Sequence, residues 1–189
     1  MIRPAKKTDF PAVFPILKQI FDEMALATIA AIPPKQFYEL MRLGFLTEAY
    51  RYAYRRIWVA TSPVDNQVVG ILVMYPDSDQ DVIDQVLISS YAKVGLPTDT
   101  VIFSDKEAWP GEWYIDALAV APAYWGQHFA SQLLDYAIKV AYSHGFKRLT
   151  LNVDLENPRA IRLYKHKGYQ SMGQMTIGTR TYEHLGLAL

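Results

Sequence analysis

The order of strand-like and helix-like segments in the C-terminal half constrains the fold more than any other feature of this chain. Residues 113–120 and 148–153 are apolar and strand-like, while residues 131–144 carry apolar side chains at helical spacing. Gly145 is a favourable stop signal for that helix, and residues 157–167 form a second helical pattern. A strand, a helix and a second strand in this order predict a β-α-β unit with a right-handed crossover.

The other segments extend this unit into one larger sheet. Residues 57–61 and 68–75 are strand-like and separated by a turn-forming stretch, so they predict an antiparallel hairpin. Further strands are predicted at residues 2–4, 169–177 and 180–187, and further helices from Phe10 onward and over residues 34–49. We therefore expect one domain over residues 1–189, of the α+β class with a three-layer α/β arrangement. Its mixed, twisted central sheet is expected to have about six or seven strands and to be flanked by about four helices.

Residues 76–110 interrupt this pattern and are predicted to be an insertion between the third and fourth strands, with one helix near residues 82–94. From Asp77 to Glu112 the chain has eight acids and two bases, a net charge of −6. From Tyr124 to the end it has four acids and eight bases, a net charge of +4. Solvated surfaces are the ordinary explanation of both clusters. A chain that handles one cationic and one anionic ligand would show the same pattern.

Composition excludes several classes of protein. The chain has no Cys, which excludes disulfides, thiolate metal sites and a Cys nucleophile. Its 19 basic and 19 acidic side chains give no net charge, which argues against a nucleic-acid partner. The four His lack paired spacing and predict no metal site. We see no export signal and no run of about 20 apolar residues, so we expect a cytoplasmic protein without a membrane partner.

The loop between the strand at residues 113–120 and the following helix is a candidate anion site. Gly126 and Ala130 are small enough to let a ligand approach the backbone, and the first helical turn holds no acidic side chain. Free N–H groups at a helix start, together with the positive end of the helix dipole, bind phosphate groups. The alternative is an ordinary strand–loop–helix junction.

The segment 157–169 is a second candidate. Asn157 is a typical N-cap residue, and Pro158 suits the first helical position. Tyr164 follows on the apolar face of this helix. Its hydroxyl is either a functional group or simply the polar tip of a half-buried aromatic side chain.

Together the two segments resemble the GNAT superfamily of acetyl-CoA-dependent N-acetyltransferases. The family's pyrophosphate loop, (Q/R)-x-x-G-x-(G/A), falls on residues 125–130. Its later motif, N-x-x-A-x-x-L-Y-x-x-x-G-(F/Y), is matched by Asn157, Ala160, Leu163, Tyr164, Gly168 and Tyr169. The first motif departs from the family's pattern, because Trp125 stands in place of the usual Arg or Gln and His128 in place of the middle Gly.

The resemblance implies a site for acetyl-CoA as co-substrate, without a metal. Backbone N–H groups of the loop would bind its pyrophosphate, the central strand would bind the acetyl carbonyl and pantetheine arm, and Asn157 would hold the pantetheine chain. The implied cofactor-binding residues are Leu118, Ala119, Val120, Gly126, Gln127, His128, Phe129, Ala130, Ser131, Asn157 and Tyr164.

The resemblance also implies direct transfer of the acetyl group, with Tyr164 protonating the leaving thiolate. A free amine has a pKa near ~10, so it must lose a proton before it attacks. Asp116 and Glu112 lie on the central strand and just before it, and they are the candidate bases. Ordered water is an alternative base, and either carboxylate has a structural role as its alternative.

The predicted function is therefore the N-acetylation of a primary amine on a small molecule or peptide. The acidic insertion favours a cationic acceptor. Two alternatives stay open, namely a non-catalytic acyl-CoA sensor or interaction domain and the acetylation of a protein N-terminus. Residues 169–187 are apolar enough for a homodimer contact, although the core of a monomer would use the same side chains.

Overall fold

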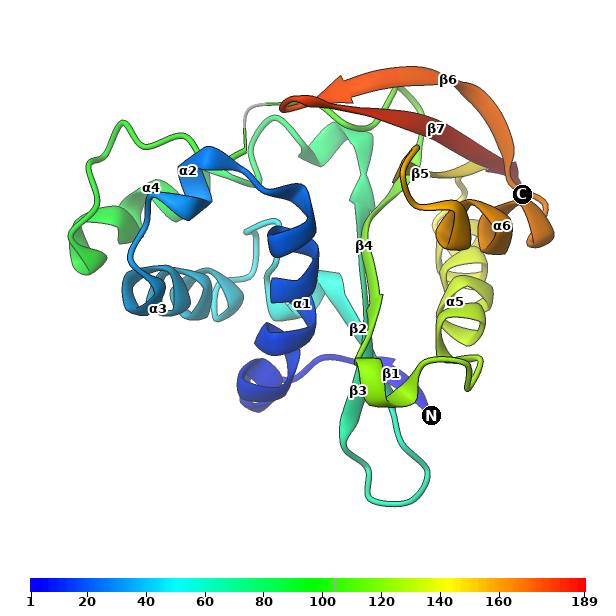
Figure 1. The fold of residues 1–189 in the computed structure, drawn as a ribbon, viewed down its shortest axis with the longest axis horizontal. Coiled ribbons are helices and arrows are strands. Elements are labelled where there is room, and N and C mark those ends of the chain that lie inside the picture. The colour runs from blue at the N-terminus through cyan, green and yellow to red at the C-terminus, as the bar shows by residue number, and fades with distance from the viewer. Residues whose placement is uncertain (104) are drawn as a thin grey trace.

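A seven-stranded sheet with the order β1-β2-β3-β4-β5-β7-β6 forms the centre of the computed structural model, which describes residues 1–103 and 105–189 (Figure 1). Neighbouring strands are antiparallel except for β4 and β5, which run parallel. The strands are β1 (Ile2–Pro4), β2 (Ile57–Thr61), β3 (Val68–Pro76), β4 (Trp113–Val120), β5 (Arg148–Asp154), β6 (Gln170–Ile177) and β7 (Arg180–Ala188).

Helices cover both faces of the sheet, which gives the predicted three layers. The helices are α1 (Phe10–Met24), α2 (Ala27–Ala30), α3 (Pro34–Phe45), α4 (Gln85–Tyr91), α5 (Phe129–Ser143) and α6 (Pro158–His166). One core lies between the sheet and α1, α3 and α4, and a second lies between the sheet and α5 and α6 (Figure 1). None of the helices in the described ranges is both long enough and apolar enough to cross a membrane.

The predicted fold class and the β-α-β unit are confirmed, with differences in detail. The helix predicted over residues 34–49 ends at Phe45, and the four-residue α2 has no counterpart in the prediction. Between β3 and β4 the chain forms α4 and the short 3₁₀ turn η4 (Ala92–Val94) in place of one continuous helix. These differences are at short elements and at the ends of elements, whose boundaries are the hardest to predict from the sequence.

Strand β4 has a bulge at Asp116. Val73 pairs with Ala117 and the next residue of β3, Met74, pairs with Ile115, so Asp116 is an extra residue. The bulge inverts the alternation of the strand, because Trp113 and Ile115 face the core under α5 whereas Ala117 faces the core under α1. This inversion explains the mixed periodicity of the segment, and it sets the direction of the Asp116 side chain.

The pairing between β4 and β5 covers only three residue pairs, which end at Ile115 and Leu151. Strand β4 continues to Val120 and β5 continues to Asp154 without further pairing between them. The backbone edge of β4 beyond Ile115 is therefore free for other hydrogen-bond partners.

Gly44, near the end of α3, allows the following segment to pack closely. A Cβ at this position would lie 2.5 Å from Cδ1 of Tyr50 and 2.9 Å from Cδ1 of Leu87. Tyr50 is fully buried, and the next residue, Arg51, is also buried. The absence of a side chain at Gly44 thus places the segment that carries Arg51 against the core.

We predict that Gly44→Ala destabilises the protein although alanine is the better helix former. Overpacking costs about 1–3 kcal/mol, which outweighs the gain of about 1 kcal/mol in helix propensity. Urea unfolding measures the free energy of unfolding, with Lys35→Ala on the exposed side of α3 as a near-neutral control. A Gly44→Ala variant as stable as the wild type would contradict the close packing described above.

Candidate functional site

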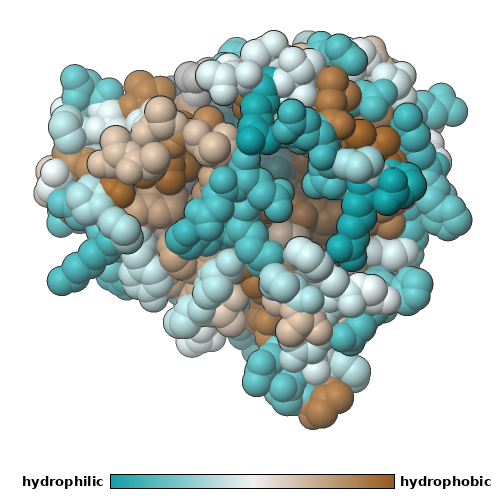
Figure 2. All heavy atoms as spheres, in the orientation of Figure 1, coloured by the Kyte–Doolittle hydropathy of each residue, from teal (hydrophilic) through white to brown (hydrophobic). Residues whose placement is uncertain are grey.

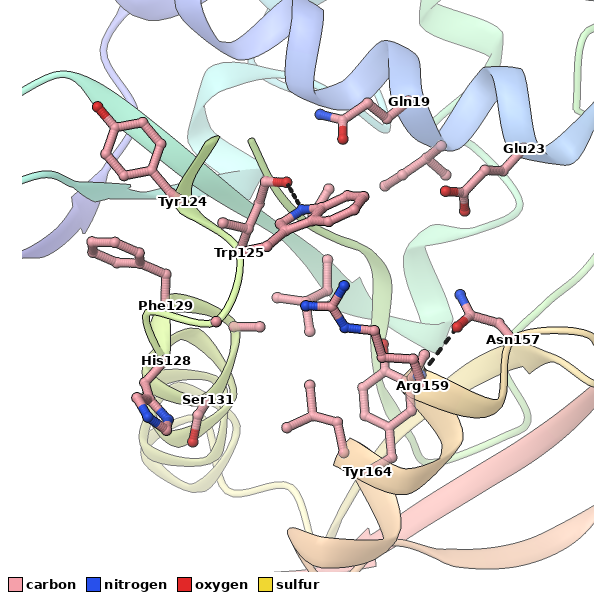
Figure 3. Close-up of a pocket in the computed structure, with 18 residues that line it drawn as sticks. Gln19, Glu23, Tyr124, Trp125, His128, Phe129, Ser131, Asn157, Arg159 and Tyr164 are labelled. Atoms are coloured by element: carbon pink, nitrogen blue, oxygen red, sulfur yellow. Dashed lines mark hydrogen bonds between the residues drawn. The ribbon is translucent and has the colours of Figure 1, made fainter. Parts of the chain in front are cut away.

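A cavity of about 470 Å³ opens where β4 and β5 separate. Its walls come from the C-terminal half of α1, the end of β4, the start of α5 and the helix α6 (Figure 3). Figure 2 shows this face of the molecule hollowed between α1 and α6, with apolar residues inside and hydrophilic residues around the rim. The cavity is lined by every residue predicted to bind a cofactor except Gln127, whose side chain turns back to the carbonyl of Ala123.

The start of α5 offers unpaired backbone donors to this cavity. The first intrahelical bond of α5 runs from Gln132 N–H to the carbonyl of His128, so the N–H groups of Phe129, Ala130 and Ser131 have no partner within the helix. The first turn contains no acidic side chain. These donors and the helix dipole together make a site for an anion.

His128 takes a left-handed backbone conformation, with φ of 64°. Residues with a Cβ rarely adopt this backbone conformation, which costs them about 1–2 kcal/mol. Gly126 in the same loop has φ of 78°, which costs a glycine little. The loop therefore keeps a shape that favours glycine at both positions, although the chain has histidine at one of them.

Trp125 and Arg159 meet across the mouth of the cavity. The indole N–H of Trp125 donates to the carbonyl of Val120 at 2.7 Å. The Arg159 guanidinium, from the first turn of α6, lies over the indole ring at 4.9 Å from its centroid (Figure 3). A cation thus stands beside the loop, although it comes from a different element of the chain.

The start of α6 brings Asn157 and Tyr164 to the same cavity. The Oδ1 atom of Asn157 accepts a hydrogen bond from Ala160 N–H at 3.0 Å, which confirms the predicted N-cap. Tyr164 is 9% exposed, and burial raises the pKa of its hydroxyl, with the Glu23 carboxylate adding to the rise. The hydroxyl is therefore protonated at neutral pH and can donate a proton.

A second cavity, of about 150 Å³, continues from the first between β4 and β5. Asn157 and Tyr164 line both cavities, and three acidic residues line the second one: Glu23, Asp116 and Asp154. Asp154 is paired with Arg180 at 2.8 Å, and the Glu23 side chain points into the space between α1 and α6 (Figure 3). The Glu23 carboxylate is close enough to the Tyr164 hydroxyl to raise its pKa, whereas the carboxylates of Asp116 and Asp154 are paired with Arg51 and Arg180.

Asp116 has one satisfied and one unsatisfied carboxylate oxygen. Its Oδ1 atom accepts from Arg51 at 2.6 Å and from the Tyr75 hydroxyl at 2.7 Å. Its Oδ2 atom is buried and has no hydrogen-bond partner within the described part of the chain. A buried unpaired carboxylate oxygen is costly, and a donor on a ligand or a water molecule would remove that cost.

Glu112, the other predicted base, lies elsewhere. Its side chain is fully buried and lines neither of these two cavities. It accepts hydrogen bonds from Trp109 N–H at 2.8 Å and from the Thr150 hydroxyl at 2.9 Å, and it lies 3.1 Å from Nε2 of His184. The structure therefore brings Asp116 and Tyr164 together at one cavity and keeps Glu112 apart from them.

Both ring nitrogens of His184 have a polar side chain within hydrogen-bond distance. The amide nitrogen of Asn152 donates to the carbonyl of Glu107, which turns the Oδ1 atom of Asn152 toward Nδ1 of His184 at 2.6 Å. Nε2 of His184 faces the Glu112 carboxylate. His184 of β7 therefore links Asn152 of β5 to the buried Glu112 carboxylate.

Arg51 is a buried residue of the site that the sequence did not indicate. Its guanidinium contacts the carboxylates of Asp84, Glu107 and Asp116 at 2.9, 3.0 and 2.6 Å. Burial raises the pKa of Glu107 to about 7 although Arg51 opposes the rise, and burial also raises the pKa of Asp84. In the sequence, Arg51 is one of several Arg and Tyr residues in a short stretch, and nothing distinguishes it from its neighbours. Only its tertiary contacts identify it.

The sequence analysis also did not identify Glu23 and Arg159 as site residues. Each belongs to an amphipathic helix, whose polar residues are expected to face solvent. The signals available in the sequence were the position of Glu23 late in α1 and that of Arg159 two residues after the Asn157 cap.

The acidic segment also differs from the simplest interpretation, which is a solvated surface. Several of its carboxylates form ion pairs with bases of the chain itself: Asp79 with Arg56, Asp81 with Lys106, and both Asp84 and Glu107 with Arg51.

Comparison with known families and structures agrees with this geometry. The family model described as the acetyltransferase (GNAT) family matches residues 17–169. A crystal structure described as that of an acetyltransferase is 34% identical, with a TM-score of 0.89, and the match covers 100% of this chain and 98% of the other. A comparison with curated proteins found no match.

Two further structures share the fold. The N-acetyltransferase from Staphylococcus aureus Mu50 is 26% identical with a TM-score of 0.82, and the match covers 99% of this chain and 100% of the other. The NatC complex bound to Gag peptide and CoA contains a chain that is 18% identical with a TM-score of 0.58, and the match covers 100% of this chain and 98% of that one. At 18% identity the likeness shows the fold alone.

The Glu112–His184 pair generates a prediction about stability. Burial by itself raises the pKa of Glu112, but the hydrogen bonds from His184, Trp109 N–H and Thr150 outweigh it and hold the pKa below its ordinary value. The pair therefore contributes stability above the unfolded-state pKa of about 4.3, and this contribution is lost as the pH falls through the lower folded-state value. We expect Glu112→Gln to lower the free energy of unfolding at pH 7 by about 3–5 kcal/mol.

The measurement is urea unfolding at pH 7 and again below pH 4, where the difference between the wild type and Glu112→Gln should shrink. Asp22→Asn, which breaks an exposed ion pair with Lys18, is the control and should change little. A difference that is absent at pH 7, or that grows on acidification, would contradict the lowered pKa of Glu112.

Proposed function

The chain belongs to the GNAT family of acetyltransferases, and on that premise we propose that it acetylates a primary amine whose protonated form is bound by carboxylates. The observation that carries this proposal is that Tyr164 and Asp116 both line the cavity between β4 and β5. Acetyl-CoA, the acetyl donor of this family, supplies a thioester whose carbonyl carbon the amine attacks, with CoA leaving as a thiolate. The remaining steps are proton transfers, and side chains of this site can perform them.

The residues of the main cavity fit the cofactor. Its volume of about 470 Å³ and its position along the free edge of β4 suit an extended chain with amide groups. The N–H groups of Phe129, Ala130 and Ser131 would hold the pyrophosphate, and the backbone of Leu118 and Val120 would hold the acetyl carbonyl and the pantetheine arm. A preorganised donor at the carbonyl oxygen can lower the activation free energy by about 3 kcal/mol.

Arg159 supplies the positive charge that the loop lacks at Trp125. The family's loop begins with Arg or Gln, whereas this chain has an indole on which Arg159 stacks. A guanidinium in that place attracts phosphate groups and forms bidentate hydrogen bonds with them. The basic charge therefore reaches the cofactor site from α6.

Asp116 is our choice for the proton acceptor, in preference to Glu112. Its Oδ2 atom has no other partner in the described residues, and Asp116 lines the same cavity as Tyr164. Glu112 already accepts hydrogen bonds at both of its oxygens. The bound ammonium would give one proton to Asp116, directly or through a water molecule, before the amine attacks the thioester. Tyr164 would give a proton to the departing sulfur, and the second proton lost by the acetylated nitrogen would restore the Tyr164 hydroxyl.

A third cavity supports an acceptor that combines an ammonium with an apolar neighbour. Its volume is about 270 Å³, and it is formed by the connection between α1 and α2, the segment before β4 and the turn between β6 and β7. Glu107 lines it among apolar side chains such as Leu26, Ile102 and Ile177. Met24 lines both this cavity and the second one, which supports a route for the acceptor toward Asp116.

We predict that His128→Gly binds CoA more tightly than His128→Ala. Glycine removes the strained left-handed conformation and the Cβ beside the phosphate site, whereas alanine keeps both and loses only the imidazole. Calorimetry measures Kd for CoA in each variant. Equal affinities for the two variants would show that the backbone at this position does not limit binding.

The function itself is tested by thiol release from acetyl-CoA with a panel of primary amines. We expect turnover that depends on the amine, and we expect Tyr164→Phe to lower kcat by about 100-fold while Kd for CoA stays close to the wild-type value. Tyr182→Phe, which removes another hydroxyl from the second cavity, is the matched control. Tight CoA binding without turnover of any amine would overturn the proposed function, and an unchanged kcat in Tyr164→Phe would remove its role as acid.

A further inference from the structure

Glu23 differs from the other acidic residues of the reaction site because no positive side chain in the described ranges is paired with it. Of the three acidic residues that line the second cavity, Asp116 is paired with Arg51 and Asp154 with Arg180. The Glu23 side chain is exposed and points into the space between α1 and α6 (Figure 3). A positively charged group of a ligand can therefore reach it without displacing a cation of the chain.

The position of Glu23 is unfavourable for the helix that carries it. Glu23 is the residue before the last one of α1, which ends at Met24. The last turn of a helix lies at the negative end of the helix dipole, so it favours cations and disfavours a carboxylate. The last turn of α1 contains no basic side chain that would compensate. Glu23 thus adds negative charge where the helix is already negative, and a bound cation would relieve this repulsion.

Two helix ends of opposite polarity border the main cavity. The start of α5, with its free N–H groups, supplies the positive end, and Glu23 lies at the negative end of α1. Figure 3 shows Glu23 and Ser131 on opposite sides of the cavity, with Arg159 between α6 and the loop. An anionic and a cationic ligand are therefore attracted to different sides of one space.

We propose that Glu23 is a specificity-determining residue that binds a second cationic group of the acceptor, so that diamines and other amines with a further positive charge are preferred. This inference rests on the proposed function and names the class of acceptor. The reacting nitrogen must lose a proton before it attacks, and a carboxylate that stays beside it would oppose that loss. A second cationic group keeps its charge throughout the reaction, so its ion pair with Glu23 persists.

Glu23 is close to the groups that react. It lines both the main cavity and the second one, as Asn157 and Tyr164 do. Burial raises the pKa of the Tyr164 hydroxyl, and the negative charge of Glu23 adds to the rise, so the carboxylate acts on that hydroxyl through space. A cationic group bound at Glu23 would therefore lie beside the proposed acid, within the span of one small acceptor molecule.

Steady-state kinetics with acetyl-CoA and pairs of acceptors of equal length test this role. Each pair is a diamine and the monoamine in which a methyl group replaces the second ammonium, such as 1,4-diaminobutane and pentylamine. A series from 1,3-diaminopropane to 1,6-diaminohexane finds the spacing that fits. We expect the wild type to have a lower KM for the fitting diamine than for its monoamine. Glu23→Gln should raise the KM of that diamine about fivefold and leave that of the monoamine unchanged.

Asp22→Asn is the matched control. Asp22 precedes Glu23 on α1 and pairs with Lys18, and it lines none of the three cavities described above. The substitution should leave the preference for the diamine unchanged.

Two further measurements separate binding of a cation from a structural role of Glu23. Calorimetry should show that Glu23→Gln binds CoA at least as tightly as the wild type, because the substitution removes a negative charge beside an anionic ligand. Urea unfolding should show that the variant is at least as stable, because a carboxylate is removed from the negative end of a helix. A variant that is less stable, or that binds CoA more weakly, would contradict the proposed role.

The kinetic comparison can also overturn the proposal. A wild type without preference for a diamine of any length would do so, and so would a Glu23→Gln variant that loses activity toward diamine and monoamine equally. An equal effect of Asp22→Asn would count against it as well. A wild type that acetylates no amine overturns the proposed function instead. Calorimetry of the diamines with the CoA-bound protein then decides the present inference, which requires binding that Glu23→Gln weakens and fails if no diamine binds.

Discussion

The site depends on the separation of two parallel strands. Strands β4 and β5 pair over three residues and then stop pairing, which leaves one edge of β4 without backbone partners. In a sheet interior such an edge would be costly, because each buried N–H and C=O group needs a hydrogen-bond partner. A ligand with amide groups can supply these partners, and the helices α5 and α6 close the space around it. The cavity is therefore a consequence of sheet geometry rather than of surface loops.

The bulge at Asp116 complements this separation. It inserts Asp116 at the point where pairing with β5 ends, and Asp116 lines the second cavity although its carboxylate side chain is only 2% exposed. On one side of that carboxylate lies the buried cluster of Arg51, and on the other side lies Tyr164 of α6. The acid and the base of the proposed reaction thus come from different layers of the fold, and the sheet fixes their relative positions.

A continuous chain of buried polar groups supports the same region. It runs from Glu112 through His184, Asn152 and the Tyr114 hydroxyl to Glu107, and from there to Arg51. Its members lie on β4, β5 and β7, in the segment before β4 and, for Arg51, in the connection between α3 and β2, so they tie the strands together where the ladder between β4 and β5 ends. Networks that satisfy all their members hold a core in one arrangement, and removing one member leaves its neighbours unpaired.

Sequence patterns predicted the architecture and many of the residues that line the main cavity. Local signals in the sequence are the β-α-β order, the Asn157 cap and the loop in which His128 takes a conformation typical of glycine. The cofactor-binding residues predicted from them line one cavity, except for Gln127. Arg51 and Glu107 could not be found in this way, because their importance comes from contacts between segments far apart in the chain. The same reason explains Glu112, whose position before β4 suggested a base although its oxygens face His184 and Thr150.

The most direct test of this account is a crystal structure of the protein with CoA bound. We expect the pantetheine arm along the free edge of β4, the pyrophosphate at the N–H groups that begin α5, and the sulfur within hydrogen-bond reach of the Tyr164 hydroxyl. Asp116 should then lie on the acceptor side of the sulfur. CoA bound outside the space between β4 and β5, or a sulfur remote from both Tyr164 and Asp116, would contradict the account.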